Sequence, residues 1–315
     1  MLIDKLANDR NICYSKTLFY DSARNAFGDI LDYFLYERKI STIFLPAYIG
    51  ISPKEGSGLY DPVRSRNGLN IIFYKMNKNL IINTEDLFKK IDTVKEPFLF
   101  LFVNYFGFID SGLEKIHDYV QKHDGFFIED NAHAFFTHYN QNKVYADIAF
   151  FSLHKQFPFD KGGMLRIYNN ELDDNNLKGE IYPRREYNLL NYSFIDIQRK
   201  MVDNYNILVE KLLGRNEFII VLRPDLFKGI VPQSFPVLLI KGDRFDIYNK
   251  LNADGFGVTS LYHTMIDPIQ NNEFEDSLYV SQRILNLPVH QDVDTTYYDS
   301  LVNLLIKYVE EGNDK

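Results

Sequence analysis

The sequence predicts an α/β fold whose sheet is mainly parallel and covered by helices on both faces. Two observations carry this prediction. Short apolar runs alternate with longer segments whose apolar residues recur at helical spacing, which is typical of strand–helix–strand units. Some runs, such as Phe98 to Val103, are apolar at every position, as expected for strands that are buried on both faces.

The elements follow in chain order. Residues 1 to 20 show no strong periodicity and are interpreted as an arm. A helix is expected over 21–39, because Asp21 or Ser22 can cap it and its apolar residues form one stripe. Segment 50–68 is rich in Gly and Pro and is expected to be a loop. The remaining elements expected in this part are strands at 42–45, 69–74, 98–103, 126–128, 148–153 and 164–168 and helices at 83–94 and 111–122.

A long helix from about residue 194 to 213 is expected to lead into a second unit. That unit has strands near 218–222, 235–240 and 284–289 and helices near 244–253 and 296–310. We therefore expect a large α/β domain over residues 1–200 and a small α+β domain over residues 201–315.

Composition limits the class of protein. The net charge is −8 and the chain has no dense Lys/Arg block, which argues against nucleic acid as a partner. The most apolar segment, Pro97 to Val103, is too short to span a membrane. The single cysteine, Cys13, and the absence of a signal pattern at the N-terminus indicate a reducing, cytoplasmic setting. Cys13 itself is interpreted as a small buried hydrophobe.

Polar side chains with reactive groups follow two of the apolar runs. Chemistry in α/β folds gathers at the carboxyl ends of strands, so a site is expected there. The candidates are Glu129, Asp130, His133, Ser152, His154 and Lys155.

Lys155 follows a strand that is expected to be buried. A partly desolvated ammonium group has a lowered pKa, and the free amine is a nucleophile toward aldehydes, as in Schiff-base chemistry. Asp130 could keep a pyridinium nitrogen protonated, as pyridoxal phosphate (PLP) requires. His133 could meet the phenolic oxygen of that cofactor and Ser152 its phosphate. Gly162-Gly163 permits a tight turn into the next strand.

The sequence of this region resembles that of the DegT/DnrJ/StrS family. The resemblance lies in Glu129-Asp-Asn-Ala-His-Ala134, in Asp147-Ile-Ala-Phe-Phe-Ser152 and in Lys155 with Gly162-Gly163 after it. It extends from about Asp21 to the C-terminus, through the segments Phe44–Tyr48, Asn104–Gly107, Asn191–Gln198 and Ile284–His290. The family consists of PLP-dependent aminotransferases that act mostly on nucleotide-linked keto-sugars.

The resemblance implies a fold-type-I PLP-transferase with a large domain of the seven-stranded type and a small C-terminal α+β domain. It implies that Lys155 holds PLP in a Schiff base and moves the proton. Asp130 would bind the pyridine nitrogen, His133 the ring oxygen and Ser152 the phosphate.

The family's Gly-Thr turn, whose backbone amides cradle the phosphate, matches Ala23 and Arg24. Asn191 would reach the phosphate of the neighbouring subunit's cofactor, which implies a homodimer with shared active sites. Tyr48 is a candidate to face the cofactor ring, although a packed aromatic is the more ordinary role.

The chain departs from the family pattern at several positions. Ala23-Arg24 replaces Gly-Thr, Asn104 replaces a His, and Ser193 replaces an Arg. The loop between Ser152 and Lys155 is two residues shorter than in most members. An N-terminal segment that shapes the sugar-nucleotide pocket of typical members is expected to be missing.

The expected function is transfer of an amino group from an amino acid, L-glutamate being the expected donor, to a keto-sugar carried on a nucleotide, in polysaccharide biosynthesis. One alternative is a PLP-dependent sugar dehydratase, in which a His replaces the lysine; His154 is adjacent to Lys155. Another is a catalytically weak PLP- or sugar-nucleotide-binding homologue. Arg64, Arg66, Arg184 and Arg185 are candidate phosphate contacts. Asp130, His133 and His138 give no ordered set of metal ligands, so no metal site is expected.

Overall fold

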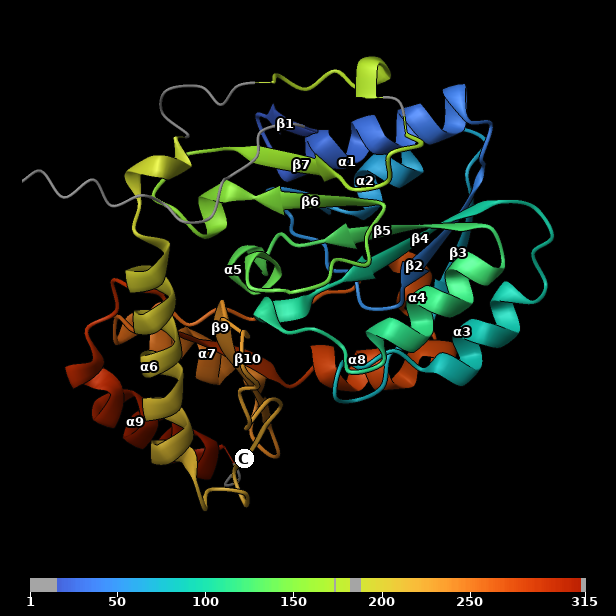
Figure 1. Ribbon diagram of the computed structural model, residues 1–315. Helices are drawn as coiled ribbons and strands as arrows, with labels where there is room; N and C mark the ends of the chain where they lie inside the picture. Colours follow the sequence, from blue (N-terminus) through green and yellow to red (C-terminus); the bar gives the residue numbers. More distant parts are fainter. Residues whose placement is uncertain (1–15, 173, 182–187, 313–315) are drawn as a thin grey trace, which may run out of the picture.

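The computed structural model describes residues 16–172, 174–181 and 188–312. A seven-stranded sheet in the order β1-β7-β6-β5-β4-β2-β3 forms the centre of the larger part (Figure 1). Its strands are β1 (Thr17–Tyr20), β2 (Thr42–Pro46), β3 (Asn70–Tyr74), β4 (Phe98–Val103), β5 (Gly125–Asp130), β6 (Ile148–Ser152) and β7 (Gly163–Ile167).

The five strands from β3 to β6 in this order are parallel, whereas β7 and β1 are antiparallel to their neighbours. The predicted mainly parallel sheet is therefore confirmed. The arm expected over residues 1–20 is wrong for Thr17–Tyr20, which pair with β7 at the edge of the sheet. A strand of four residues is too short to show a period, and its stability comes from this pairing and from burial of Leu18 and Phe19.

Helices cover both faces of this sheet (Figure 1). Because neighbouring residues of a strand point to opposite faces, Phe126 and Phe127 of β5 pack on different sides. Phe126 lies 4.9 Å, between ring centroids, from Phe34 after the first helix, and Phe127 lies 5.6 Å from His117. The helices of this part are α1 (Ala23–Asp32), the π-helix η1 (Tyr33–Glu37), α2 (Tyr60–Arg64), α3 (Thr84–Ile91), α4 (Leu113–Lys122) and α5 (Phe135–Tyr139).

The rest of the chain builds a smaller antiparallel sheet with its own helices. The sheet has the order β10-β9-β8, and the predicted domain boundary at residue 200 falls inside α6. The elements are α6 (Phe194–Leu212), β8 (Ile219–Val221), β9 (Ser234–Leu239), α7 (Arg244–Ala253), α8 (Glu275–Ser281), β10 (Ile284–Pro288) and α9 (Tyr298–Glu311).

Short 3-10 turns join these elements. They are η2 (Tyr105–Gly107), η3 (Leu153–Lys155), η4 (Asp174–Asn176), η6 (Leu189–Asn191), η7 (Asp267–Ile269), η8 (Asn272–Phe274) and η9 (Thr295–Tyr297). Helix α2 lies inside the segment expected to be a loop, and α5 and α8 were not expected. Within the described ranges, no helix combines the length and the apolar character needed to cross a membrane.

Candidate active site

Lys155 ends the short turn η3 that follows β6. Its Nζ lies 2.9 Å from Nε2 of His133, which belongs to the loop after β5. Burial of the amine lowers the pKa of Lys155, whereas the negative charges of Asp130 and Glu55 act in the opposite direction. The residue as a whole is exposed, while its amine lies against the buried His133.

Asp130 and His133 are both buried, with 6% and 5% of their surfaces exposed. Burial raises the pKa of Asp130 to about 6, against the lowering effects of the Ala132 N–H and of Lys155. Burial, and then the charge of Lys155, hold the pKa of His133 well below its usual value. The predicted catalytic residues therefore lie together, and His133 is neutral at physiological pH.

The tautomer of His133 is fixed by the loop after β4. The backbone N–H of Phe106 points at Nδ1 of His133 at 3.4 Å, and the two rings stack with centroids 5.9 Å apart. A neutral imidazole that accepts a hydrogen bond at Nδ1 carries its proton on Nε2. His133 therefore presents an N–H donor on the side that faces Lys155.

Ser152 and the start of α1 form a second part of the site. Ser152 is the register partner of Gly163 on β7. A Cβ on Gly163 would overlap the backbone of Ser22 and Ala23, so these two segments touch only because residue 163 is glycine. The first amides of a helix lack partners within the helix. The N–H groups of Asn25 and Ala26 are bonded to Ser22. The amides of Ala23 and Arg24 and the hydroxyl of Ser152 therefore remain as the candidate phosphate cradle, and its role stays a prediction.

The side chain of Arg24 does not lie in that cradle. Its guanidinium donates to the backbone carbonyl of Glu55 at 2.6 Å and so fastens the loop 52–56 to α1. This loop is closed by backbone hydrogen bonds in both directions between Ser52 and Gly56. Burial and the charge of Lys155 lower the pKa of His154, and the negative charge of Glu55 opposes the lowering of the pKa at both His154 and Lys155. Sequence reasoning missed Glu55, because no pattern marks a loop acid as a neighbour of a residue one hundred positions away.

Asn191 is exposed at the end of η6, and its backbone N–H donates to Asn188. Its predicted contact involves a second subunit and stays a prediction. Ser193, where the family has an arginine, caps α6: its Oγ accepts from the N–H of Asp196 and donates to the carboxylate of that residue. Arg184 and Arg185 lie outside the described residues.

Glu129, another candidate from the sequence, lies apart from Lys155, Asp130 and His133. Glu129 points to the opposite face of the sheet from Asp130, where His138 Nδ1 lies 3.0 Å from its Oε2. Asn131 Nδ2 donates to the same oxygen and its Oδ1 accepts from Asn104 Nδ2. This buried network supports the loop that carries His133. Asn104, where the family has a His, thus holds the loop rather than a substrate.

Tyr48 is completely buried. Its ring packs at 5.4 Å against Tyr105, edge to face, and its hydroxyl is bonded on both sides by the segment Leu261-Tyr262. The structure therefore shows Tyr48 as a packed aromatic residue and not as one that faces a cofactor.

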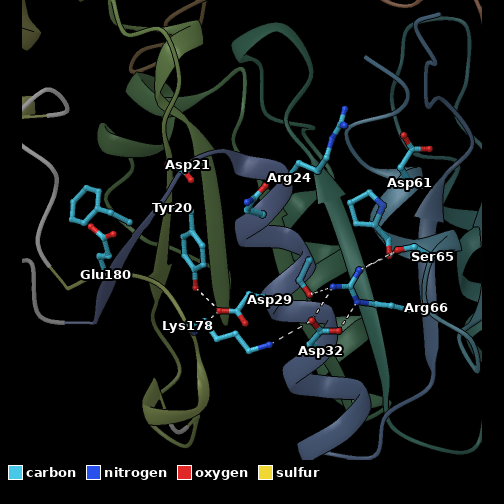
Figure 2. Close-up of a pocket in the computed structure, with 14 residues that line it drawn as sticks. Tyr20, Asp21, Arg24, Asp29, Asp32, Asp61, Ser65, Arg66, Lys178 and Glu180 are labelled. Atoms are coloured by element: carbon cyan, nitrogen blue, oxygen red, sulfur yellow. Dashed lines mark hydrogen bonds and ion pairs between the residues drawn. The ribbon is translucent and has the colours of Figure 1, made fainter. Parts of the chain in front are cut away.

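A cavity of about 640 Å³ opens beside α1, next to the cradle (Figure 2). Its charged groups are largely paired within the chain. Arg66 donates to both carboxylate oxygens of Asp32 and to two backbone carbonyls, and Tyr20 donates to Asp29. Arg66 therefore joins α1 to α2 and is not a free phosphate contact, and Arg64 is paired with Asp61.

The fold and the site define the class of protein: the architecture is that of the fold-type-I PLP-dependent transferases. Residues 64–180 match the sequence model of the DegT/DnrJ/EryC1/StrS aminotransferase family, and the predicted resemblance to that family is thereby confirmed. The comparison with curated proteins gave no match.

Solved structures show the same fold over nearly the whole chain. A DegT DnrJ EryC1 StrS aminotransferase from Brucella abortus has 16% identity and a TM-score of 0.72, covering 93% of this chain and 86% of its own. PseC from Helicobacter pylori, an aminotransferase of pseudoaminic acid biosynthesis, has 17% identity and a TM-score of 0.70, covering 94% and 87%. The E coli GDP-4-keto-6-deoxy-D-mannose-3-dehydratase, with bound hydrated PLP, has 15% identity and a TM-score of 0.69, covering 92% and 87%.

Proposed function

We propose that this protein is a PLP-dependent aminotransferase that moves an amino group from an amino acid, L-glutamate being the expected donor, to a keto-sugar. A nucleotide-linked acceptor and a place in polysaccharide biosynthesis follow from the family resemblance and belong to the same proposal. The observation that carries it is the contact between Lys155 Nζ and His133 Nε2 beside a buried Asp130.

The residues present fit PLP at both of its ends. The cradle between β6, β7 and the start of α1 offers a hydroxyl and unpaired backbone amides, which suit a phosphate dianion. Gly163 allows β7 and the start of α1 to approach this closely, because a Cβ there would overlap the backbone of Ser22 and Ala23. At the other end lies the carboxyl group of Asp130. The positive charge of a pyridinium nitrogen would favour the ionised form of this group and pair with it.

PLP, when bound, acts as the electron sink for the carbanion at the substrate α-carbon. Lys155 would hold the cofactor covalently and then, as a free amine, take and return the proton at that carbon, for which its lowered pKa suits it. His133 would donate its Nε2 proton to the ring oxygen. Asp130 would keep the ring nitrogen protonated.

Two observations favour amino transfer over its rivals. In a dehydratase the histidine replaces the lysine, but here the amine of Lys155 meets His133, whereas His154 Nδ1 lies 3.3 Å from Ser152 Oγ. A protein that only binds its ligand has no use for a buried acid with a raised pKa next to an accessible amine.

The test is the absorption spectrum of the purified protein with added PLP, before and after L-glutamate. We expect a band of lysine-bound PLP that is lost to the pyridoxamine form when glutamate is added. Lys155→Ala should abolish the band, and Lys161→Ala, an exposed lysine paired with Asp21, should leave it unchanged.

Amino transfer that survives Lys155→Ala would contradict the mechanism. A protein that forms the lysine-dependent band but does not respond to any amino acid would contradict amino transfer. If no band forms at all, the binding homologue becomes the better interpretation.

A further inference from the structure

Tyr262 lies directly on the backbone of Gly50. The position of an added Cβ on Gly50 is occupied by Cβ, Cγ and Cδ1 of Tyr262, so the tyrosine ring stands where a side chain of residue 50 would be. The two residues come from different parts of the chain: Gly50 follows β2 of the large sheet, and Tyr262 precedes the segment that returns to β10. A side chain of the C-terminal part thus packs against the backbone that follows β2 of the large sheet.

Three hydrogen bonds hold the main chain at Leu261-Tyr262, and a fourth holds that of Tyr48. Its N–H donates to the hydroxyl of Tyr48 at 2.9 Å, and that hydroxyl donates to the carbonyl of Leu261 at 3.0 Å. On the other side the N–H of Leu261 donates to Asn286 Oδ1 on β10 at 2.9 Å, and the Tyr105 hydroxyl donates to the carbonyl of Tyr48 at 2.6 Å. The position of the Tyr262 ring is therefore determined by both parts of the molecule.

A continuous series of ring contacts joins this place to Lys155. The centroid of Tyr262 lies 6.0 Å from Tyr48, which lies 5.4 Å from Tyr105. Phe106, which follows Tyr105, stacks on His133, the contact of Lys155. Burial, and then the charge of Asp130, raise the pKa of Tyr262, so its phenol is neutral and lies within electrostatic reach of that carboxylate.

Tyr262 differs from the other three aromatic residues of this series in its surroundings. Tyr48, Tyr105 and Phe106 are buried, with 0%, 6% and 2% of their surfaces exposed. Tyr262 is only partly buried, and among residues 16–172, 174–181 and 188–312 its hydroxyl has no hydrogen-bond partner. Of these four aromatic residues, Tyr262 is therefore the one whose surface is partly exposed.

We propose that Tyr262 is the aromatic residue that covers the PLP ring, and that Tyr48 serves it as a positioning residue by clamping Leu261-Tyr262. This inference rests on the proposed function. A neutral phenol ring within electrostatic reach of Asp130 supplies a flat apolar face for a pyridine ring, and aromatic rings pack well in offset or tilted arrangements. Gly50 makes this possible because it leaves room for a ring brought in from the C-terminal part.

The test is a titration of the apoprotein with PLP, followed by absorption and by the circular dichroism band of the bound cofactor. Tyr262→Ala should weaken PLP binding about tenfold and diminish the dichroic band, whereas Tyr262→Phe should keep both within about twofold, because the ring is retained. Repeating the pair in a Lys155→Ala background removes the covalent bond from the comparison. Tyr248→Ala, a partly buried tyrosine of α7, is the matched control and should leave both readouts unchanged.

Two further variants keep the inference testable. Tyr262→Leu retains apolar bulk if Tyr262→Ala does not fold, and it should still lose the dichroic band. Tyr48→Phe removes only the clamp hydroxyl and should diminish the band without removing any group that touches PLP.

Wild-type affinity and an unchanged band in Tyr262→Ala and Tyr262→Leu would overturn the inference while leaving the proposed function intact. Failure of the proposed function is a different result, in which the wild-type protein itself gives no PLP band.

Discussion

Asp130 is a carboxyl group that the folded chain keeps where ionisation is unfavourable. Its pKa is raised by burial from 3.8 to about 6, so the folded state keeps a proton that the unfolded state has already lost between those values. Over that interval the free energy of unfolding falls as pH rises. Above about pH 6 the loss is complete and amounts to roughly 3 kcal/mol at most.

Asp130→Asn should therefore stabilise the apoprotein. The variant keeps an oxygen that can accept from the Ala132 N–H but carries no charge. Its advantage in the free energy of unfolding should be close to zero near pH 4 and about 1–3 kcal/mol above pH 7, measured by urea unfolding at several pH values. The exposed Asp203→Asn is the control. A stability advantage of Asp130→Asn that does not change with pH would contradict the raised pKa of Asp130. Asp130→Asn should also lose PLP binding, whatever its effect on stability.

At the residue scale, the sequence predicted Lys155, Asp130, His133 and Ser152, because each lies at or just after the end of a strand that could be inferred. Glu55 and Tyr262 could not be predicted, since their contacts with Lys155 and with Gly50 join positions one hundred or more residues apart. For Tyr48 the sequence favoured a packed role, which the structure shows, but only the folded chain reveals that Leu261-Tyr262 binds its hydroxyl.

At the element scale, the close approach of β7 to the start of α1 forms the proposed phosphate cradle. Gly163→Ala should push these segments apart, since the added carbon would overlap Ser22 and Ala23. Overpacking of this kind costs about 1–3 kcal/mol. We expect a lower Tm and weaker binding of PLP and of inorganic phosphate, measured by calorimetry.

Gly58→Ala is the matched control for that substitution. Nothing lies within 4 Å of a Cβ at this position, so stability and binding should stay close to wild type. Normal phosphate binding by Gly163→Ala would show that the cradle is not where the phosphate lies.

Elements with strong periodicity or clear caps could be predicted from the sequence. Strand β4 matches its predicted bounds, and α3 begins after the predicted cap, Asn83, whose side chain accepts from the N–H of Asp86. Strand β1 could not be found, because its stability comes from pairing with β7 and not from its own pattern. Gly162, with a φ of 143°, shows why the predicted tight turn before β7 needs glycine.

At the scale of the whole molecule, the predicted homodimer remains to be measured. Asn191 is exposed and makes no side-chain contact that would occupy it within the described part of its own chain. We expect two chains per particle in sedimentation, and Asn191→Ala should raise the PLP dissociation constant about three- to tenfold through loss of one hydrogen bond to a charged group. Asn79→Ala, an exposed asparagine between β3 and α3, should not. A PLP-loaded monomer would contradict the assignment.

The contact between Tyr48 and Tyr262 spans 214 positions of the chain. During synthesis, the large sheet and Lys155 are complete long before residue 262 leaves the ribosome, so a nascent chain of about two hundred residues has the lysine and the cradle but no cover over them. If Tyr262 covers the cofactor as proposed above, stable capture of PLP is expected to be a late event, which occurs only once the C-terminal part has folded onto the sheet.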